Sequence, residues 1–146
     1  MMKGMIIFAG VMAALINTGC ETDLNLKSTL PLNDTIEIAN FETKYNFENN
    51  LVLRMDSVLN DSRCPSNVQC VWEGNAAVRF LFTVDSIQTV FTLNTNGGMQ
   101  FNSDTVMSGY NIKLLDLSPY PEDPGEILQV EYYSEIMVHA ITASLD

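Results

Sequence analysis

The chain has 146 residues and a strongly acidic balance, with 7 Lys and Arg against 18 Asp and Glu and a formal net charge of -11 at pH 7. This balance argues against binding to nucleic acid and against peripheral binding to anionic lipid through basic side chains. Hydrophobic residues make up 47% of the chain and charged residues 17%. This composition is typical of a folded globular protein, and the length fits one domain.

The first predicted element is a leader peptide over residues 1–19. Met1–Lys3 is short and positive, and the apolar run Met5–Ile16 is shorter than the roughly 20 residues that span a bilayer. The run ends in Leu15-Ile16-Asn17-Thr18-Gly19-Cys20. This ending resembles the lipobox of bacterial lipoproteins, although Asn17 stands where that family usually has Leu. The resemblance implies cleavage before Cys20 and membrane anchoring by lipid on its sulfur; the alternative is an ordinary signal peptide and a buried Cys20.

The residues after the cysteine bear on location and spacing. Glu21 follows Cys20, whereas Asp at that position is what retains lipoproteins at the inner membrane of enteric bacteria, so the outer membrane is predicted. Glu21 and Asp23 also resemble surface-export signals of some bacterial groups. The domain is therefore expected to face either the periplasm or the cell surface. Residues 20–33 are mostly polar and are interpreted as a lipidated tether.

Two further cysteines, Cys64 and Cys70, remain once Cys20 is assigned to lipid. An even pair in an oxidising compartment predicts a disulfide, which would stabilise a local loop by roughly 2 kcal/mol. The alternative is a metal site. It has little support, because five residues separate the cysteines and no His lies nearby. No metal and no other cofactor is predicted.

Hydrophobic side chains alternate with more polar ones from residue 34 onward, the pattern of strands with one buried face. The alternating sets are Ile36 and Ile38; Leu51, Leu53 and Met55; and Val78, Phe80, Phe82 and Val84. The stretches Val78–Val84 and Ile87–Leu93 are joined by Asp85-Ser86 and are predicted to form a hairpin. Tyr132–Ile141 is mixed on both faces, which predicts a central strand buried on both sides.

Turn signals recur between these stretches, so seven or eight mostly antiparallel strands are expected over residues 34–146. The signals are Asn49-Asn50, Asp85-Ser86, Asn94–Gly98, Ser108-Gly109 and Ser118–Gly125. The chain is therefore predicted to be all-β, a single β-sandwich of Ig-like or jelly-roll topology, with a small β-barrel as the alternative.

One block differs from the rest of the chain in its density of unusual residues. It reads Asp61-Ser62-Arg63-Cys64-Pro65-Ser66-Asn67-Val68-Gln69-Cys70-Val71-Trp72-Glu73-Gly74. This resembles a D-S-R-C-P-x5-C-x-W-x-G motif of small secreted or lipid-anchored bacterial proteins, and the later Ser118-Pro119-Tyr120-Pro121 fits the same group. The resemblance spans most of residues 35–141. It implies a β fold but no particular activity.

The block has a structural interpretation and two functional ones. In the structural one, Trp72 lies over the disulfide and closes one end of the sandwich, Arg63 bonds to Asp61 or to loop carbonyls, and Gly74 provides a positive φ or a close approach. In the first functional one, the stiffened loop presents Arg63 to a protease as an inhibitor. In the second, Trp72 and Tyr120 stack on sugar rings.

Catalytic residues are not indicated. His139, the one histidine, lies between Val138 and Ala140 in an apolar stretch, where a structural role is favoured over a catalytic base. There is no G-x-S-x-G nucleophile motif and no phosphate-binding glycine loop. Acidic residues of the Pro-rich stretch could offer oxygen ligands to Ca²⁺, although a solvated loop is favoured; they are Glu122, Asp123 and Glu126.

Four tripeptides share the form Asp, then Ser or Thr, then an aliphatic residue. Their central residues are Thr35, Ser57, Ser86 and Thr105. The form resembles the acceptor of general protein O-glycosylation in some bacteria, but it is also typical of a turn that leads into a strand. Both interpretations stay open.

Together, these observations predict a non-enzymatic, lipid-anchored β-sandwich that binds a protein or a glycan at the cell envelope. The alternatives are a protease inhibitor that presents the Cys64–Cys70 loop and, third, a hydrolase that uses His139 with nearby carboxylates.

Overall fold

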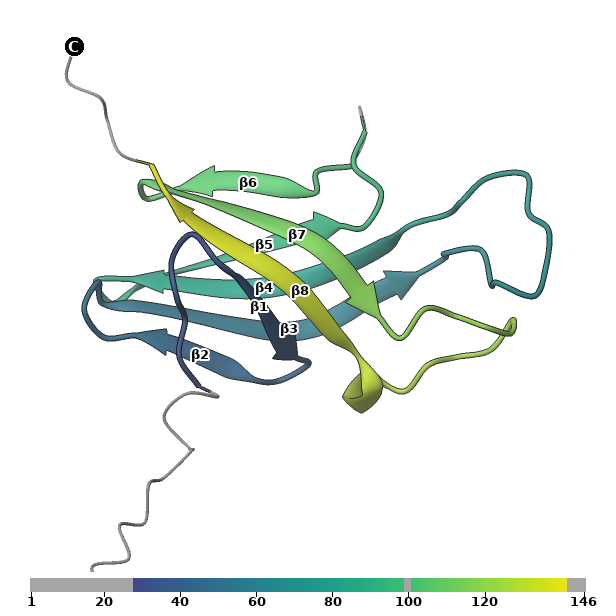
Figure 1. The fold of residues 1–146 in the computed structure, drawn as a ribbon, viewed down its shortest axis with the longest axis horizontal. Coiled ribbons are helices and arrows are strands. Elements are labelled where there is room, and N and C mark those ends of the chain that lie inside the picture. The colour runs from purple at the N-terminus through teal and green to yellow at the C-terminus, as the bar shows by residue number, and fades with distance from the viewer. Residues whose placement is uncertain (1–27, 99–100, 142–146) are drawn as a thin grey trace, which may run out of the picture.

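The computed structural model describes residues 28–98 and 101–141, and they form a two-layered β structure (Figure 1). One sheet has the strand order β1-β8-β7-β6 and the other β2-β3-β4-β5, and neighbouring strands are antiparallel. The strands are β1 (Thr35–Ala39), β2 (Thr43–Asn46), β3 (Leu51–Asp61), β4 (Ala76–Val84), β5 (Ile87–Asn94), β6 (Asp104–Met107), β7 (Tyr110–Ser118) and β8 (Tyr133–Ala140), with the short 3-10 helix η1 (Gln129–Glu131) before β8. The predicted all-β sandwich is confirmed. The barrel alternative is wrong, because the two sheets do not close on each other.

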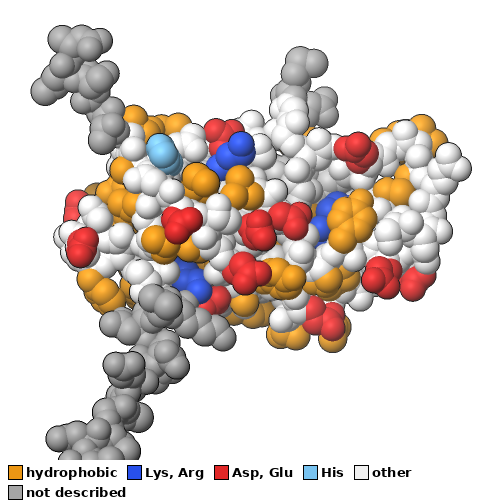
Figure 2. Space-filling model, viewed as in Figure 1, with side chains coloured by type: hydrophobic (Ala, Val, Ile, Leu, Met, Phe, Trp, Pro, Cys, Tyr) orange, Lys and Arg blue, Asp and Glu red, His pale blue; other side chains and the backbone are white. Residues whose placement is uncertain are grey.

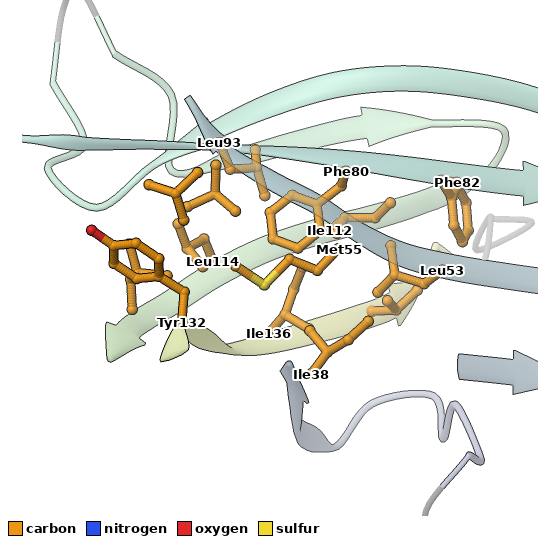
Figure 3. Packing of buried hydrophobic residues seen from close by; sticks show 14 of the residues in the cluster. Ile38, Leu53, Met55, Phe80, Phe82, Leu93, Ile112, Leu114, Tyr132 and Ile136 are labelled. Carbon is orange, nitrogen blue, oxygen red and sulfur yellow. The ribbon is translucent and has the colours of Figure 1, made fainter. Parts of the chain in front are cut away.

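The core lies between the two sheets, as the period-2 alternation predicts. Along β4 every second residue is buried, and the same holds for the first half of β3. Side chains of both sheets point into the space between them (Figure 3). From the first sheet come Ile38, Ile112, Leu114, Ile136 and Val138, and from the second Leu53, Met55, Val78, Phe80, Phe82 and Leu93.

Strand β8 differs from its prediction in one respect. It lies between β1 and β7, so its central position is confirmed. It is not buried on both sides, however, because Ser134, Ile136 and Val138 face the core while His139 is exposed on the outer face. The buried hydroxyl of Ser134 breaks the hydrophobic alternation and conceals the period of the strand. The prediction of two buried faces is therefore wrong.

The β4–β5 hairpin turns at Asp85 and Ser86, as predicted. Both residues have positive φ, 48° and 72°. Two consecutive positive φ values are the signature of the primed turn that matches the twist of a tight hairpin.

The folded part begins earlier than the sequence predicts. Leu30 is fully buried in the core, its N–H donates to the carbonyl of Tyr45 at 2.8 Å, and the N–H of Tyr45 donates to the carbonyl of Ser28 at 2.8 Å. Residues 28–33 therefore belong to the domain, and the predicted tether boundary at Asn33 is wrong. The predicted leader and Cys20 lie outside the described residues. In the described part, no helix is long and apolar enough to cross a membrane.

Candidate binding site

Two long connections lie side by side at one end of the sandwich (Figure 1). Residues 62–75 join β3 to β4, and residues 119–132 join β7 to β8; we call them together the loop end. The N–H groups of Ser66 and Asn67 donate to the carbonyls of Pro121 and Glu122, at 3.0 and 3.3 Å. The side-chain amide of Asn67 also donates to the Asp123 carboxylate. These bonds fix the two loops to each other.

Arg63 forms the base of the loop end and is only 7% exposed. Its Nε and NH2 donate to the two carboxylate oxygens of Asp61 at 2.9 and 2.6 Å. The guanidinium also donates to the carbonyl of Leu117 and, at 2.8 Å, to that of Pro119. Burial and a forked geometry make this a structural arginine. The interpretation as an inhibitor residue that enters a protease is therefore wrong for Arg63, whereas its predicted bonds to Asp61 and loop carbonyls are confirmed.

Asp61 and Tyr132 extend this network into the core. The Tyr132 hydroxyl donates to Asp61 Oδ2 at 3.0 Å, and the Tyr132 ring lies at one end of the hydrophobic cluster (Figure 3). Burial alone would raise the pKa of Asp61, but the hydrogen bonds and charge of Arg63 hold it below its usual value. Burial and the bond to Asp61 raise the pKa of Tyr132 to about 12. The network is thus an ionised carboxylate held between a cation and a neutral phenol.

The first loop is closed by two local constraints. Cys64 and Cys70 form the predicted disulfide, and the N–H of Cys64 donates to the carbonyl of Glu73 at 2.8 Å. Gly74 has φ +75°, and a Cβ there would lie 1.8 Å from the Ser62 carbonyl oxygen. Both the positive φ and the close approach that the sequence suggested at Gly74 are therefore present.

Trp72 does not close the sandwich, contrary to the structural interpretation of the block. Its side chain is 78% exposed, and its neighbour Val71 is 91% exposed. The end of the core is filled instead by Tyr132 and Leu117, which are buried. The Arg63 network occupies the space beneath the loop, so Trp72 is left at the surface.

Trp72 and Tyr120 line one hollow of about 340 Å³ together with both cysteines. Its other lining residues are Pro65, Ser66, Val68, Val71 and Glu73. The guanidinium of Arg63 lies 5.0 Å from the centre of the Tyr120 ring. Among the predicted binding residues, the structure brings Trp72 and Tyr120 to one surface and places Arg63 behind them. In Figure 2, hydrophobic and acidic side chains are interspersed over this end.

A second hollow of about 650 Å³ lies between the end of β3 and the second loop. It is more polar, and its acidic lining residues are Asp61, Asp123 and Glu126. Asp61 is bound to Arg63, and Asp123 accepts a bond from Asn67. No group of three or more His, Cys, Asp or Glu in residues 28–98 and 101–141 is placed to hold a metal ion. The considered Ca²⁺ site has no support here.

Gln129 is a structural residue that the sequence analysis missed. Its Oε1 accepts from Asn40 Nδ2 at 2.8 Å and from the N–H of Val58 at 3.0 Å, and its Nε2 donates to the Val58 carbonyl at 2.8 Å. One amide thus connects the second loop to β3 and to the turn after β1. No local pattern around Gln129 signals contacts to residues so distant in the sequence.

His139 and the modification candidates lie away from the loop end. His139 is exposed on the outer face of β8 and lines neither hollow described above, so neither hollow supports the hydrolase interpretation. Thr35 and Ser86 are exposed, in β1 and in the β4–β5 turn, while Ser57 and Thr105 are half-buried in β3 and β6.

Comparison of the chain with protein-family models, curated proteins and solved structures found no match.

Proposed function

We propose that this protein is a non-catalytic binding module of the bacterial cell envelope, anchored at the outer membrane by lipid on Cys20, that holds a partner protein at its loop end. The proposal is carried by one observation. Trp72 and Val71 are 78% and 91% exposed on a loop whose backbone is fixed by a disulfide and by hydrogen bonds. Exposed apolar side chains on a rigid support are characteristic of interaction surfaces.

The chemistry of the loop end suits a protein partner. Trp and Tyr are the residue types that contribute most to interface energy when a partner covers them. Exposed apolar residues of the loop end that lie at or beside the disulfide ring are Val68, Val71, Trp72 and Tyr120, and the second loop adds Leu128 and Val130. The Cys64–Cys70 ring and the bonds between the two loops hold these side chains in place before binding, which lowers the ordering cost of association.

The position of the loop end suits presentation from a membrane. The described chain begins beside β2, and it finishes after β8 at the same end of the sandwich (Figure 1). The loop end lies at the opposite end. A partner could therefore reach Trp72 without contact with the segment that leads to Cys20.

A glycan partner is the second candidate, favoured by the hollow that Trp72 and Tyr120 share. Its volume of about 340 Å³ is at the lower end of the range of small-molecule sites. The two rings offer flat apolar surfaces, and Ser66 and Glu73 at the hollow offer hydrogen-bonding groups. Because the chain is acidic, a neutral glycan fits this hollow better than an anionic one.

The partner proposal is tested by quantitative cross-linking from cells that carry wild type, Trp72→Ala or Val90→Ala. Val90 is an exposed apolar residue of β5 and serves as the matched control. We expect one protein to be enriched with wild type and Val90→Ala and lost with Trp72→Ala, at unchanged thermal stability. Equal recovery from all three strains would refute the proposed site.

Calorimetry with envelope oligosaccharides, on the same three proteins, tests the glycan candidate.

The anchor is tested by metabolic labelling with a fatty acid and by the mass of the mature protein. We expect label on wild type and none on Cys20→Ser, together with an N-terminal peptide that begins at a lipid-modified Cys20. An unlipidated N-terminus would overturn the anchor, whatever the loop end binds.

A further inference from the structure

A second exposed aromatic group lies at the end of the sandwich opposite the loop end. It consists of Tyr45, in β2, and Phe47, in the turn that follows. Their ring centroids are 5.7 Å apart and the planes are inclined by 4°, so the rings are stacked. Phe47 is nonetheless 80% exposed. Tyr45 is more covered, at 38% exposed, so it is chiefly the Phe47 ring that is available to an external apolar phase.

This aromatic pair borders the segment through which the chain enters the domain. Thr29 pairs with Tyr45 in a parallel bridge, and Leu30 is bound to the Tyr45 carbonyl. A hollow of about 540 Å³ is lined by both rings and, from that segment, by Thr29, Leu30, Pro31 and Leu32. The first described residue is thus beside the pair, and the chain continues from it toward Cys20.

The short distance along the chain limits how far the pair can be from the membrane. If lipid is attached at Cys20, residues 20–27 connect the bilayer to the domain, and even fully extended they span at most about 28 Å. This tether is shorter than the predicted 20–33, because residues 28–33 are part of the fold. Such a short link keeps the aromatic pair at a high effective concentration at the bilayer surface.

We propose that Tyr45 and Phe47 insert into the headgroup region of the bilayer to which the chain is tethered. The inference rests on the proposed anchor. Aromatic rings are favoured at the membrane–water interface, where an apolar body meets the acyl boundary and a polar tip such as the Tyr hydroxyl stays hydrated. With the pair in the membrane, the sandwich stands on this end, and Trp72 at the loop end points away from the bilayer.

The local charges decide which lipid suits this contact. Glu48 lines the same hollow as the pair, and Asp85 is bound to Asn50 of the neighbouring turn, with Asn50 Nδ2 donating at 3.3 Å. These carboxylates and the net charge of -11 disfavour an anionic surface. The contact is therefore apolar, strongest on zwitterionic lipid, and dependent on the tether, because two rings alone give weak partition.

The test uses the natural cysteines and the single Trp. Cys64 and Cys70 are paired, which leaves the Cys20 thiol of the chain 20–146 for coupling to a maleimide lipid in phosphatidylcholine vesicles. Two proteins are compared. In the wild type the single indole is that of Trp72, at the loop end. In the double variant Phe47→Trp with Trp72→Phe, the single indole is at position 47, in place of the exposed aromatic ring. Lipids brominated along the acyl chain quench only an indole that reaches them.

We expect blue-shifted and quenched emission for the indole at position 47 and unchanged emission for Trp72. Replacing part of the phosphatidylcholine by phosphatidylglycerol should reduce the quenching. Uncoupled protein should show none. Hydrogen exchange on coupled wild type gives a second reading, with vesicle-dependent protection of the β2–β3 turn and none of residues 64–73.

Three outcomes would overturn the inference. Quenching of Trp72 would mean that the loop end faces the bilayer, and equal emission with and without brominated lipid at position 47 would mean no insertion. A blue shift at position 47 without vesicles would mean that another part of the chain or a second copy covers the pair. Because coupling is chemical, these results are independent of whether cells acylate Cys20. Failure of lipidation in cells would overturn the anchor alone.

Discussion

The guanidinium of Arg63 is stacked against the ring of Tyr120, with 5.0 Å between Cζ and the ring centre. The same guanidinium is bound to Asp61, to the carbonyl of Leu117 near the end of β7 and to that of Pro119 in the second loop. One side chain therefore joins β3, the end of β7 and the exposed aromatic surface. Arg63 thus supports the ring of Tyr120 and also holds the buried network, so the proposed binding surface and the stability of the fold share this residue.

Removing Arg63 should be costly. In Arg63→Ala, the Asp61 carboxylate keeps only the Tyr132 hydroxyl and a backbone N–H in a largely buried setting, and the carbonyls of Leu117 and Pro119 lose a donor. Loss of one partner of a buried ion pair costs about 3–5 kcal/mol. Urea denaturation at pH 7 should show a loss of this size in the free energy of unfolding.

The matched control is Arg79→Ala, which breaks the pair of Arg79 with Asp56. Arg79 Nε donates to Asp56 Oδ2 at 2.6 Å, but the Arg79 side chain is 43% exposed. Such pairs contribute about 1 kcal/mol or less. Equal losses in the two variants would contradict the role assigned to Arg63.

Stability should fall at both ends of the pH scale for reasons that lie in the same network. Asp61 has a pKa in the folded protein below its ordinary value of 3.8. As the pH falls, the unfolded chain therefore takes up the proton first, and the stabilisation that the Asp61 carboxylate gives to the fold is lost below about pH 4. Tyr132 has a folded pKa of about 12 against 10.0. The stabilisation from the neutral Tyr132 hydroxyl is complete below pH 10 and is lost between pH 10 and 12, by about 3 kcal/mol.

The Tyr132→Phe variant isolates the alkaline part of this dependence. Other tyrosines and lysines titrate in the same range in both proteins, so the difference between wild type and Tyr132→Phe reports Tyr132 itself. We expect the stability difference to shrink as the pH rises from 10 to 12, measured by urea midpoints at each pH. A constant difference would show that the Tyr132 hydroxyl has the same pKa in the folded and unfolded states.

Gly74 should tolerate alanine less well than Gly109 does. Both have positive φ, +75° and +81°, but a Cβ at Gly109 meets nothing within 4 Å, whereas at Gly74 it would lie 1.8 Å from the Ser62 oxygen. Gly109→Ala should lose about 1–2 kcal/mol, the cost of a left-handed conformation. Gly74→Ala should lose clearly more, because the backbone of the first loop must also move. Similar melting temperatures for the two variants would contradict this explanation.

The O-glycosylation hypothesis predicts a mass for the native protein above that of polypeptide plus lipid. Ser86 and Thr35 are exposed and are the expected sites, whereas Ser57 and Thr105 are half-buried. Ser86→Ala should lower the mass by one glycan, and Thr92→Ala, an exposed strand position outside the four tripeptides, should not. A native mass equal to the lipidated polypeptide would reject the hypothesis.

The sandwich could be predicted from sequence where local patterns decide the structure. The hairpin of β4 and β5 follows from the alternation in Val78–Val84 and from the short connection Asp85-Ser86 that joins it to Ile87–Leu93. The disulfide follows from the number and compartment of the cysteines. Gly74 follows from its place in the block, because glycine is the residue that fits both a positive φ and a backbone contact.

The loop end could not be predicted, because long-range contacts decide it. Trp72 was expected to cover the disulfide, but Tyr132 already fills that end of the core, and nothing in the block indicates this. Gln129 binds Val58 across 71 sequence positions. Leu30 lies outside any alternating stretch, and it packs in the core beside β2, where its N–H is bound to the Tyr45 carbonyl. In each case the role of the residue depends on another residue that becomes its neighbour only when the chain folds.

The early pairing of Leu30 beside β2 also has a mechanical consequence. Thr29 runs parallel to the strand at Tyr45, so a pull on residues 20–27 loads the bonds of Ser28 and Leu30 to Tyr45 in shear, together and not one after another. Leu30 must leave the core before the load can pass further. If the chain is anchored at Cys20 as proposed, tension between the membrane and the domain would first load this edge of one sheet, at the end opposite Trp72 and the disulfide.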